Sequence, residues 1–296
     1  MQSNIFPIQV PLVYILTLNW NRYNDTLDFL RSCSLITYTN FEIIVIDNGS
    51  TDTSTTIIKS QFPTIKQILN EKNLGFAAGI NVGIRYALEQ NADFVFLVNN
   101  DTTLHADILT HLINGITQSE AYLAAPAIYF MSRPDHIWSA GAMRRKITLE
   151  IKPCTPVLDS TKMFNVDVIT GCGMLMRREC LTEIGLFDEQ FFMYYEDMDY
   201  CLRVRARGLA IVVVPEAMMW HKVATSSGGS GSPNERYHMA KSSVLFFRKH
   251  IYGWRWGVVI PYRTVSAIKS IVRLVRQRRW IAARAYLVGL YQGITF

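Results

Sequence analysis

The first half of the chain alternates short apolar runs with longer polar stretches. The apolar runs are rich in Val, Ile and Phe and span residues 10–18, 41–46, 65–69 and 94–98. Runs of this length and composition are typical of buried strands. The stretches between and after them predict helices at 25–34, 53–60, 77–90 and 106–117. Because strand–helix alternation favours a parallel sheet covered on both faces, we expect an α/β fold.

The second half is less regular. Its pattern predicts strands at 122–130, 166–176 and 210–214, a helix at 198–207 and a loop at 225–233. Within 264–279, four apolar residues recur at helical spacing, and basic residues follow the same spacing one step along. This spacing predicts an amphipathic helix with a cationic face.

The charges divide the chain into two regions. The 296 residues include 30 Lys+Arg and 24 Asp+Glu, a net charge of +6. Glu235 is the last acidic residue, and residues 236–296 carry 12 Lys+Arg, which leaves −6 on residues 1–235. We therefore predict a main domain at 1–235 and a basic, amphipathic, helical C-terminal region at 236–296.

Composition excludes several classes of protein. Hydrophobic residues make up 49% and charged residues 18%, which argues against a disordered chain. The five cysteines form no CxxC pair, so we expect reduced thiols in a cytosolic protein. The sequence predicts neither a signal peptide nor a membrane-spanning helix, because the apolar runs are too short.

Polar clusters follow three of the apolar runs. They comprise Asn19 with Asn21, residues 47–50 and residues 99–101. In sheets of this class, ligands bind at the carboxyl ends of the strands. A turn with helix caps explains one such cluster equally well, because Asp, Asn, Gly and Ser favour turns. Three clusters at successive strand ends favour a ligand site.

The order of these clusters and two later motifs resembles family two glycosyltransferases with the GT-A fold. The motifs are Asp47-Asn48-Gly49-Ser50-Thr51-Asp52, Asn73-Leu74-Gly75-Phe76-Ala77-Ala78-Gly79-Ile80-Asn81, Asn99-Asn100-Asp101, Glu196-Asp197-Met198-Asp199 and His221. The sequence is most similar to rhamnosyltransferase-type members. The resemblance covers about residues 10–225. It implies a mixed, mainly parallel sheet, with a donor half at about 1–101 and an acceptor half at about 102–235.

The resemblance implies a nucleotide-sugar site at the first strand ends. It places the nucleoside against Asp47, with Thr17 and Asn19 beside it. Asn73 and Gly75 suit a loop in which the backbone approaches the ligand. The full donor-binding set is Thr17, Asn19, Asp47, Asn73, Gly75, Asn81, Asn99 and Asp101. For Gly79 and Gly83, close packing of a small-residue helix on the sheet explains the glycines equally well.

Asn99-Asn100-Asp101 stands where the family has its Asp-any-Asp metal motif. The change to Asn99 leaves Asp101 as the only carboxylate of the three. The resemblance implies a divalent cation, Mg²⁺ or Mn²⁺, held by Asp101 and His221. An imidazole ligand suits Mn²⁺ better. A helix cap at Asp101 and a structural, buried His221 are the alternative interpretations.

Glu196 and Asp197 are the predicted catalytic carboxylates. An inverting transfer needs one carboxylate to take the proton of the attacking hydroxyl. The resemblance assigns this role to Asp197, with Glu196 contacting the acceptor or substituting for Asp197. A solvated acidic helix start is the alternative. The aromatic run at 191–195 argues against full solvation, and we interpret Cys172 as a packing residue.

The resemblance implies an inverting, metal-dependent glycosyltransferase of cell-surface polysaccharide synthesis. Its donor would be a dTDP-sugar carrying rhamnose, and its acceptor a saccharide or a polyprenyl-linked saccharide. Alternatives are a nucleotidyltransferase and an inactive sugar-nucleotide-binding scaffold. The first requires a glycine-rich loop, which the segment 19–22 lacks; the Asn99 change keeps the second open.

The basic C-terminal region predicts a peripheral position at the inner, cytoplasmic membrane surface, where Lys, Arg, Trp and Tyr all favour binding. A helix packed on the catalytic domain and a homo-oligomer contact are the alternatives. We expect no nucleic-acid partner, because the body is acidic and has no nucleic-acid-binding motif.

Overall fold

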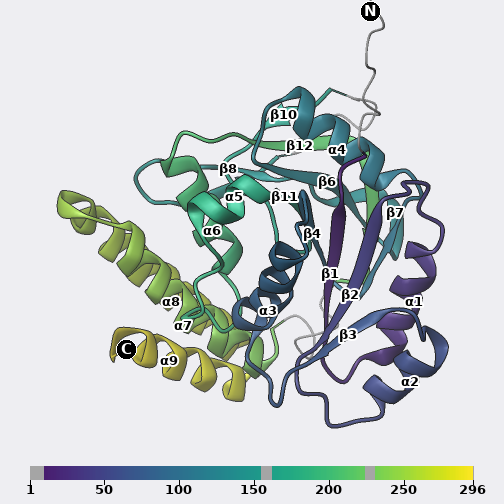
Figure 1. The fold of residues 1–296 in the computed structure, drawn as a ribbon. Helices are drawn as coiled ribbons and strands as arrows, with labels where there is room; N and C mark the ends of the chain where they lie inside the picture. The colour runs from purple at the N-terminus through teal and green to yellow at the C-terminus, as the bar shows by residue number, and fades with distance from the viewer. Residues whose placement is uncertain (1–9, 155–161, 224–230, 296) are drawn as a thin grey trace, which may run out of the picture.

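The computed structural model describes residues 10–154, 162–223 and 231–295 (Figure 1). Most of its strands join one sheet, in the order β10-β12-β6-β11-β4-β1-β2-β3, while β5 pairs with β12 and β7 with β6. The strands of this sheet are β1 Val13–Asn19, β2 Phe41–Asp47, β3 Lys66–Leu69, β4 Phe94–Val98, β5 Thr102–Leu104, β6 Leu123–Phe130, β7 Arg133–Ser139, β10 Phe164–Asn165, β11 Gly173–Arg177 and β12 Ile211–His221. A separate hairpin pairs β8 Ala142–Arg144 with β9 Ile151–Pro153.

The first four predicted strands are confirmed, and they run parallel. β1 lies between β2 and β4, and β3 pairs with β2 in parallel. In the other half, β11 runs antiparallel to both β4 and β6, and β12 runs parallel to β6. The sheet is therefore mixed and mainly parallel, as the sequence predicts.

Alternation along β1 gives each face of the sheet its own core. Tyr14 and Leu16 join the core that includes α3, α5, α6 and α7, while Val13 and Ile15 join the core that includes α1, α2 and α4. Helices thus cover both faces (Figure 1). The helices are α1 Tyr23–Cys33, α2 Ser54–Gln61, α3 Phe76–Glu89, α4 Ile108–Gln118, α5 Arg178–Ile184, α6 Glu196–Ala206, α7 Pro233–His250, η1 Gly253–Arg255, α8 Trp256–Arg276 and α9 Trp280–Thr295.

Two predicted strands were wrong in extent. The segment 166–176 is not one strand: β10 ends at Asn165, before this segment begins, and the chain enters the main sheet again at Gly173, as β11 between β6 and β4. The strand predicted at 210–214 continues to His221, because a register shift between Val214 and Met218 lets β12 keep pairing with β6. Of the loop predicted at 225–233, residues 225–230 lie outside the described residues.

The C-terminal helices are partly built into the main core. Leu245, Phe246 and Phe247 of α7 belong to the same core as α3 and α6. α9 packs on α7 at Gly289 and Gly293, where a side chain would collide with α7. The predicted amphipathic helix lies within α8, and the predicted boundary at residue 235 falls in the first turn of α7. In the described part of the chain, no helix combines the length and hydrophobicity needed to span a membrane.

Candidate active site

A large cavity lies over the carboxyl ends of β1, β2 and β4. Its volume is about 1380 Å³, which exceeds the range of roughly 300–1,000 Å³ typical of single small-ligand sites. Its walls come from strand ends, the β8–β9 hairpin, the start of α6 and the C-terminal helices α7 and α8. The cavity therefore has room for two substrates side by side.

The Asn19–Asp47 pair lies beneath this cavity. The Asn19 amide donates to Asp47 Oδ2 (2.8 Å), and the backbone N–H and hydroxyl of Ser50 donate to the same carboxylate (2.8 and 2.7 Å). Thr17 is fully buried on β1. None of Thr17, Asn19 and Asp47 lines the cavity, so their predicted contacts with a nucleoside stay predictions.

A loop around Asn48 forms one wall. The Asn48 amide donates to Asn73 Oδ1 (3.1 Å) and to the Gly75 carbonyl (3.0 Å), and Asn73 Oδ1 also accepts from the Gly75 N–H (2.8 Å). Gly75 has φ 83°, and a side chain there would collide with the Phe192 carbonyl. All three residues line the cavity. Sequence reasoning missed Asn48 as a site residue, although it belongs to the Asp47 motif.

Asn81 lies away from the cavity. Its amide donates to the Phe187 carbonyl and to Glu189 Oε1 (both 2.9 Å), and its oxygen accepts from the Phe187 N–H (3.1 Å). The hydrogen bond from Asn81, together with Arg85, lowers the pKa of Glu189 despite partial burial. Asn81 therefore fixes the segment that leads to residues 191–195, and the structure does not place it with the other predicted donor residues.

Pairing between β5 and β12 brings Asp101 and His221 together. His221 lies opposite Thr102 in this pairing, and the distance from His221 Nε2 to Asp101 Oδ1 is 3.1 Å. Both residues are buried, and His221 lines the cavity with Asn99 and Asn100. The two predicted metal ligands are thus neighbours in space, although they are far apart in the sequence.

The Asp101–His221 pair offers only part of a cation's coordination shell. The buried Nδ1 of His221 has no hydrogen-bond partner in the described part of the chain. Among residues 10–154, 162–223 and 231–295, no three His, Cys, Asp or Glu side chains gather as a metal site. One carboxylate and one imidazole fit a divalent cation that takes its other ligands from phosphate and water.

The start of α6 presents Glu196 and Asp197 to the cavity. Tyr194 and Tyr195 immediately before it have φ 69° and 68°, a left-handed conformation that is costly for such residues. This sharp turn leads directly into the helix, so both carboxylates belong to its first turn. Both residues line the cavity, as the predicted catalytic role requires.

Burial dominates the electrostatics of these two carboxyls. Burial raises the pKa of Asp197, against hydrogen bonds from the Gly171 N–H (3.2 Å) and the Met198 N–H (2.7 Å). Burial and the charge of Asp197 raise the pKa of Glu196 well above its ordinary value. A carboxylate with a raised pKa is a stronger proton acceptor than an ordinary one.

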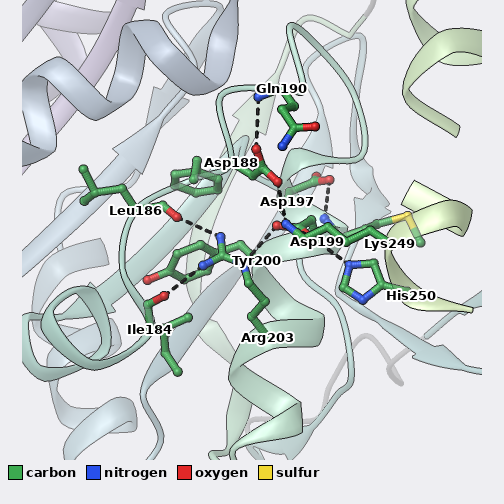
Figure 2. Close-up of polar contacts among 12 residues, drawn as sticks. Ile184, Leu186, Asp188, Gln190, Asp197, Asp199, Tyr200, Arg203, Lys249 and His250 are labelled. Carbon is green, nitrogen blue, oxygen red and sulfur yellow. Dashed lines mark hydrogen bonds and ion pairs between the residues drawn. The ribbon is translucent and has the colours of Figure 1, made fainter. Parts of the chain in front are cut away.

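Asp199, on the same turn, has the opposite surroundings (Figure 2). Its carboxylate is fully buried and contacts Arg203 Nε (2.9 Å), Lys249 Nζ (2.8 Å) and His250 Nε2 (2.7 Å). Burial alone would raise the pKa of Asp199, but the hydrogen bonds from His250 and Lys249 and the charge of Arg203 lower it. Since Lys249 and His250 end α7, this cluster joins α7 to α6.

Comparison with known proteins identifies the family. A family model described as "Glycosyltransferase like family 2" matches residues 11–239. The chain belongs to this family. As a family 2 glycosyltransferase, the protein is an enzyme. This family membership excludes the alternative that it is a nucleotidyltransferase.

Curated relatives include rhamnosyltransferases. The glycosyltransferase is 24% identical to dTDP-rhamnosyl transferase RfbF of Shigella flexneri, over 84% of this chain and 82% of that one. It is 23% identical to N-acetylglucosaminyl-diphospho-decaprenol L-rhamnosyltransferase of Mycobacterium tuberculosis, over 85% of this chain and 91% of the relative. The rhamnosyltransferase-like resemblance predicted from the motifs is confirmed at the level of homology.

Solved structures confirm the GT-A fold. GalNAc-T7 with UDP, GalNAc and Mn²⁺ superposes with a TM-score of 0.64 at 16% identity, covering 82% of this chain and 51% of that one. The mannosyltransferase PcManGT of Pyrobaculum calidifontis, solved with GDP-Man and Mn²⁺, gives a TM-score of 0.59 at 14% identity and covers 96% of this chain and 87% of its own.

Proposed function

We propose that this glycosyltransferase moves rhamnose from a dTDP-sugar to a lipid-linked saccharide, with inversion at the anomeric carbon. The observation that carries the proposal is the position of Asp197: a carboxylate with a raised pKa in the wall of a cavity large enough for donor and acceptor. The two rhamnosyltransferase relatives support a rhamnosyl donor, and the name of the mycobacterial relative supports a diphospho-lipid acceptor.

In the proposed reaction, an acceptor hydroxyl oxygen attacks the anomeric carbon. The bond from this carbon to the diphosphate oxygen breaks, and the diphosphate leaves with the bonding electron pair. Asp197 takes the hydroxyl proton, so the protein supplies one base and forms no covalent intermediate. Burial raises the pKa of Glu196 well above its ordinary value, which favours the protonated form, and in that form Glu196 can donate a hydrogen bond to the acceptor.

Donor recognition rests on the polar wall at the strand ends. Asn73, Gly75 and Asn99 line this part of the cavity, together with Asn48 and Arg22. Arg22, which sequence reasoning missed, forms an ion pair with Asp25 (2.7 Å) that holds its guanidinium in place. A fixed cation at this end suits a nucleotide diphosphate.

Asp101 and His221 would hold the divalent cation with the donor phosphates. When bound, such a cation supplies positive charge that stabilises the departing diphosphate. Asp101 supplies the carboxylate and His221 the imidazole, which favours Mn²⁺ over Mg²⁺.

The outer faces of α8 and α9 support a peripheral position at an anionic membrane surface on the cytoplasmic side. Large apolar side chains are exposed there, among them Ile260, Ile268, Trp280 and Ile281. The same region, residues 236–296, has 12 basic and no acidic residues. Apolar and cationic side chains together favour binding to the surface of an anionic bilayer.

A transfer assay with the purified chain tests the proposal. It compares dTDP-rhamnose with UDP-N-acetylglucosamine and GDP-mannose, on N-acetylglucosaminyl-diphospho-lipid and on octyl N-acetylglucosaminide, with Mn²⁺ and with a chelator. We expect rhamnosyl product from dTDP-rhamnose only, with the opposite anomeric configuration, and none after chelation. A preference for another donor would contradict the proposed dTDP-rhamnose donor, and retained configuration would contradict inversion. Full activity in the chelator would contradict the metal dependence.

A further inference from the structure

Arg263 is a cation of the C-terminal region that faces the active-site cavity. It lies on α8, and it lines the cavity together with Tyr262 and with Phe247 of α7. Most other basic residues of α8 and α9 are exposed on the outside, whereas Arg263 is half-buried. Attachment to a membrane surface does not account for a basic residue at this position.

The guanidinium of Arg263 is held in place by neutral groups. Its Nη2 donates to Ser243 Oγ (3.1 Å), and its carbon lies 4.6 Å from the centre of the Phe247 ring. Burial raises the pKa of Tyr195, and the nearby charge of Arg263 acts against this increase. Arg263 is thus fixed beside Tyr195, two residues before Asp197.

No carboxylate in the described part of the chain forms an ion pair with Arg263. Arg203 and Lys249, by contrast, do form ion pairs: both contact Asp199, and Lys249 also contacts Asp188. A partly buried cation without a counter-ion costs free energy, and a ligand anion would recover it. Guanidinium groups pair with phosphate oxygens through two parallel hydrogen bonds.

The surroundings of Arg263 show which kind of phosphate would fit. Phe247 and Tyr262, which neighbour Arg263, give this part of the cavity aromatic walls, in contrast to the asparagine-rich strand ends, and the Tyr262 hydroxyl donates to Glu150 (2.9 Å). Val265 and Ile268, further along the same helix, are exposed apolar residues. The cation therefore lines the same cavity as the proposed base and lies on a helix that also carries exposed apolar side chains.

We infer that Arg263 binds the phosphate that links the acceptor sugar to its lipid. This inference rests on the proposed function, because it assigns the acceptor end of the same cavity. Arg263 acts as a specificity-determining residue: it selects acceptors that carry a lipid phosphate and positions their sugar at Asp197. It leaves donor binding to the strand ends.

A binding experiment tests this assignment independently of turnover. The probe is farnesyl diphosphate, a lipid diphosphate without a sugar, titrated into the full chain without vesicles. We expect Arg263→Gln to weaken binding about 10- to 100-fold, since a charge-assisted contact is lost. Lys269→Gln removes the same charge from the exposed side of α8 and is expected to leave binding unchanged. Farnesol, which has no phosphate, should bind both variants and the original chain alike.

Steady-state kinetics provides the second measurement. Arg263→Gln should raise KM for the N-acetylglucosaminyl-diphospho-lipid by a similar factor, with KM for dTDP-rhamnose and the rate on octyl N-acetylglucosaminide unchanged. Arg263→Lys should restore part of the loss. Equal binding of farnesyl diphosphate by Arg263→Gln and the original chain would overturn the inference, as would weaker binding of dTDP. Arg263-dependent binding without rhamnosyl transfer would instead overturn the proposed function alone.

Discussion

Asp197 and Asp199 lie two residues apart on α6 and have opposite surroundings. Asp197 faces the cavity, accepts hydrogen bonds from the backbone N–H groups of Gly171 and Met198 and from the Thr170 side chain, and has a raised pKa. Asp199 lies on the other side of the turn, contacts Arg203, Lys249 and His250, and has a lowered pKa (Figure 2). Burial alone therefore does not determine the role of a carboxyl group. The partners decide whether it accepts a proton or holds two helices together.

The largest expected effect is on catalysis, from a substitution of Asp197, which faces the cavity. Asp197→Asn keeps the shape of the side chain but removes its capacity to accept a proton. We expect kcat to fall about 10²- to 10⁴-fold, with little change in the melting temperature. Rhamnosyl transfer measured under donor and acceptor saturation checks this. A variant that retained more than a tenth of the activity would show that another group is the base.

The second effect concerns Asp199. Asp199→Asn removes the carboxylate partner of Arg203 and one of the two carboxylates that contact Lys249, and we expect a loss of about 3–5 kcal/mol in the free energy of unfolding. Asp28→Asn is the matched control, because Asp28 also contacts Arg31 and Lys222 but is half exposed, and its loss should stay below about 1 kcal/mol. Denaturant unfolding measures both. Equal losses of unfolding free energy in the two variants would contradict the expected difference between the buried Asp199 and the half-exposed Asp28.

The pH dependence of Asp199's contribution follows from its lowered pKa. The stabilisation is present above the ordinary aspartate pKa of about 3.9 and is lost as pH falls through the lower, folded-state value. The difference in stability between the original chain and Asp199→Asn should therefore narrow only below about pH 4. Urea unfolding between pH 3 and pH 7 measures this narrowing, and a difference that shrank at pH 6 would point to another group.

The pH profile of transfer tests the raised pKa of Asp197. Asp197 must be ionised to accept a proton, and burial raises its pKa. The acid limb of kcat/KM should therefore lie above the ordinary aspartate value of about 3.9. Activity measured from pH 4 to pH 8 at constant cation concentration checks it. An acid limb below pH 4 would contradict the raised pKa.

The smallest effect is expected at Glu196. Because its folded-state pKa is raised, the folded protein keeps a proton that the unfolded chain releases above about pH 4.3, and stability falls as pH rises. Glu196→Gln removes this cost, so its melting temperature should exceed the original by a few degrees at pH 7 and match it near pH 4. Thermal unfolding at the two pH values tests this. A variant less stable at pH 7 would contradict the raised pKa.

The sequence predicted the parallel half of the fold well because its signals are local. Each of the strands β1, β2 and β4 is an apolar run, and polar residues follow each run within a few positions. The prediction for 166–176 failed because Val166, Val168 and Ile169 are apolar and buried like strand residues, although they precede β11 and do not belong to it. Periodicity carries no information about which neighbour each part pairs with.

The sequence indicated candidate residues of the site but not their contacts. The motifs indicated Asp101, His221 and Asp197, and the structure places them around or beside one cavity. Asn81, by contrast, fixes a loop 106 positions away, which no local pattern encodes. Arg263 lies one residue before the predicted amphipathic segment, and its contacts with Ser243 and Phe247 of α7 depend on packing that no local pattern encodes.

The distance in sequence between β5 and β12 also determines when a growing chain can form the Asp101–His221 pair. Asp101 leaves the ribosome about 120 residues before its neighbour His221. At roughly 5–20 residues per second, the two are separated by about 6–24 s of synthesis. During this interval the nascent chain has its first strand ends but lacks β12, α6 and the walls from α7 and α8. A truncated product of stalled translation therefore carries the sugar-nucleotide motifs without the complete site.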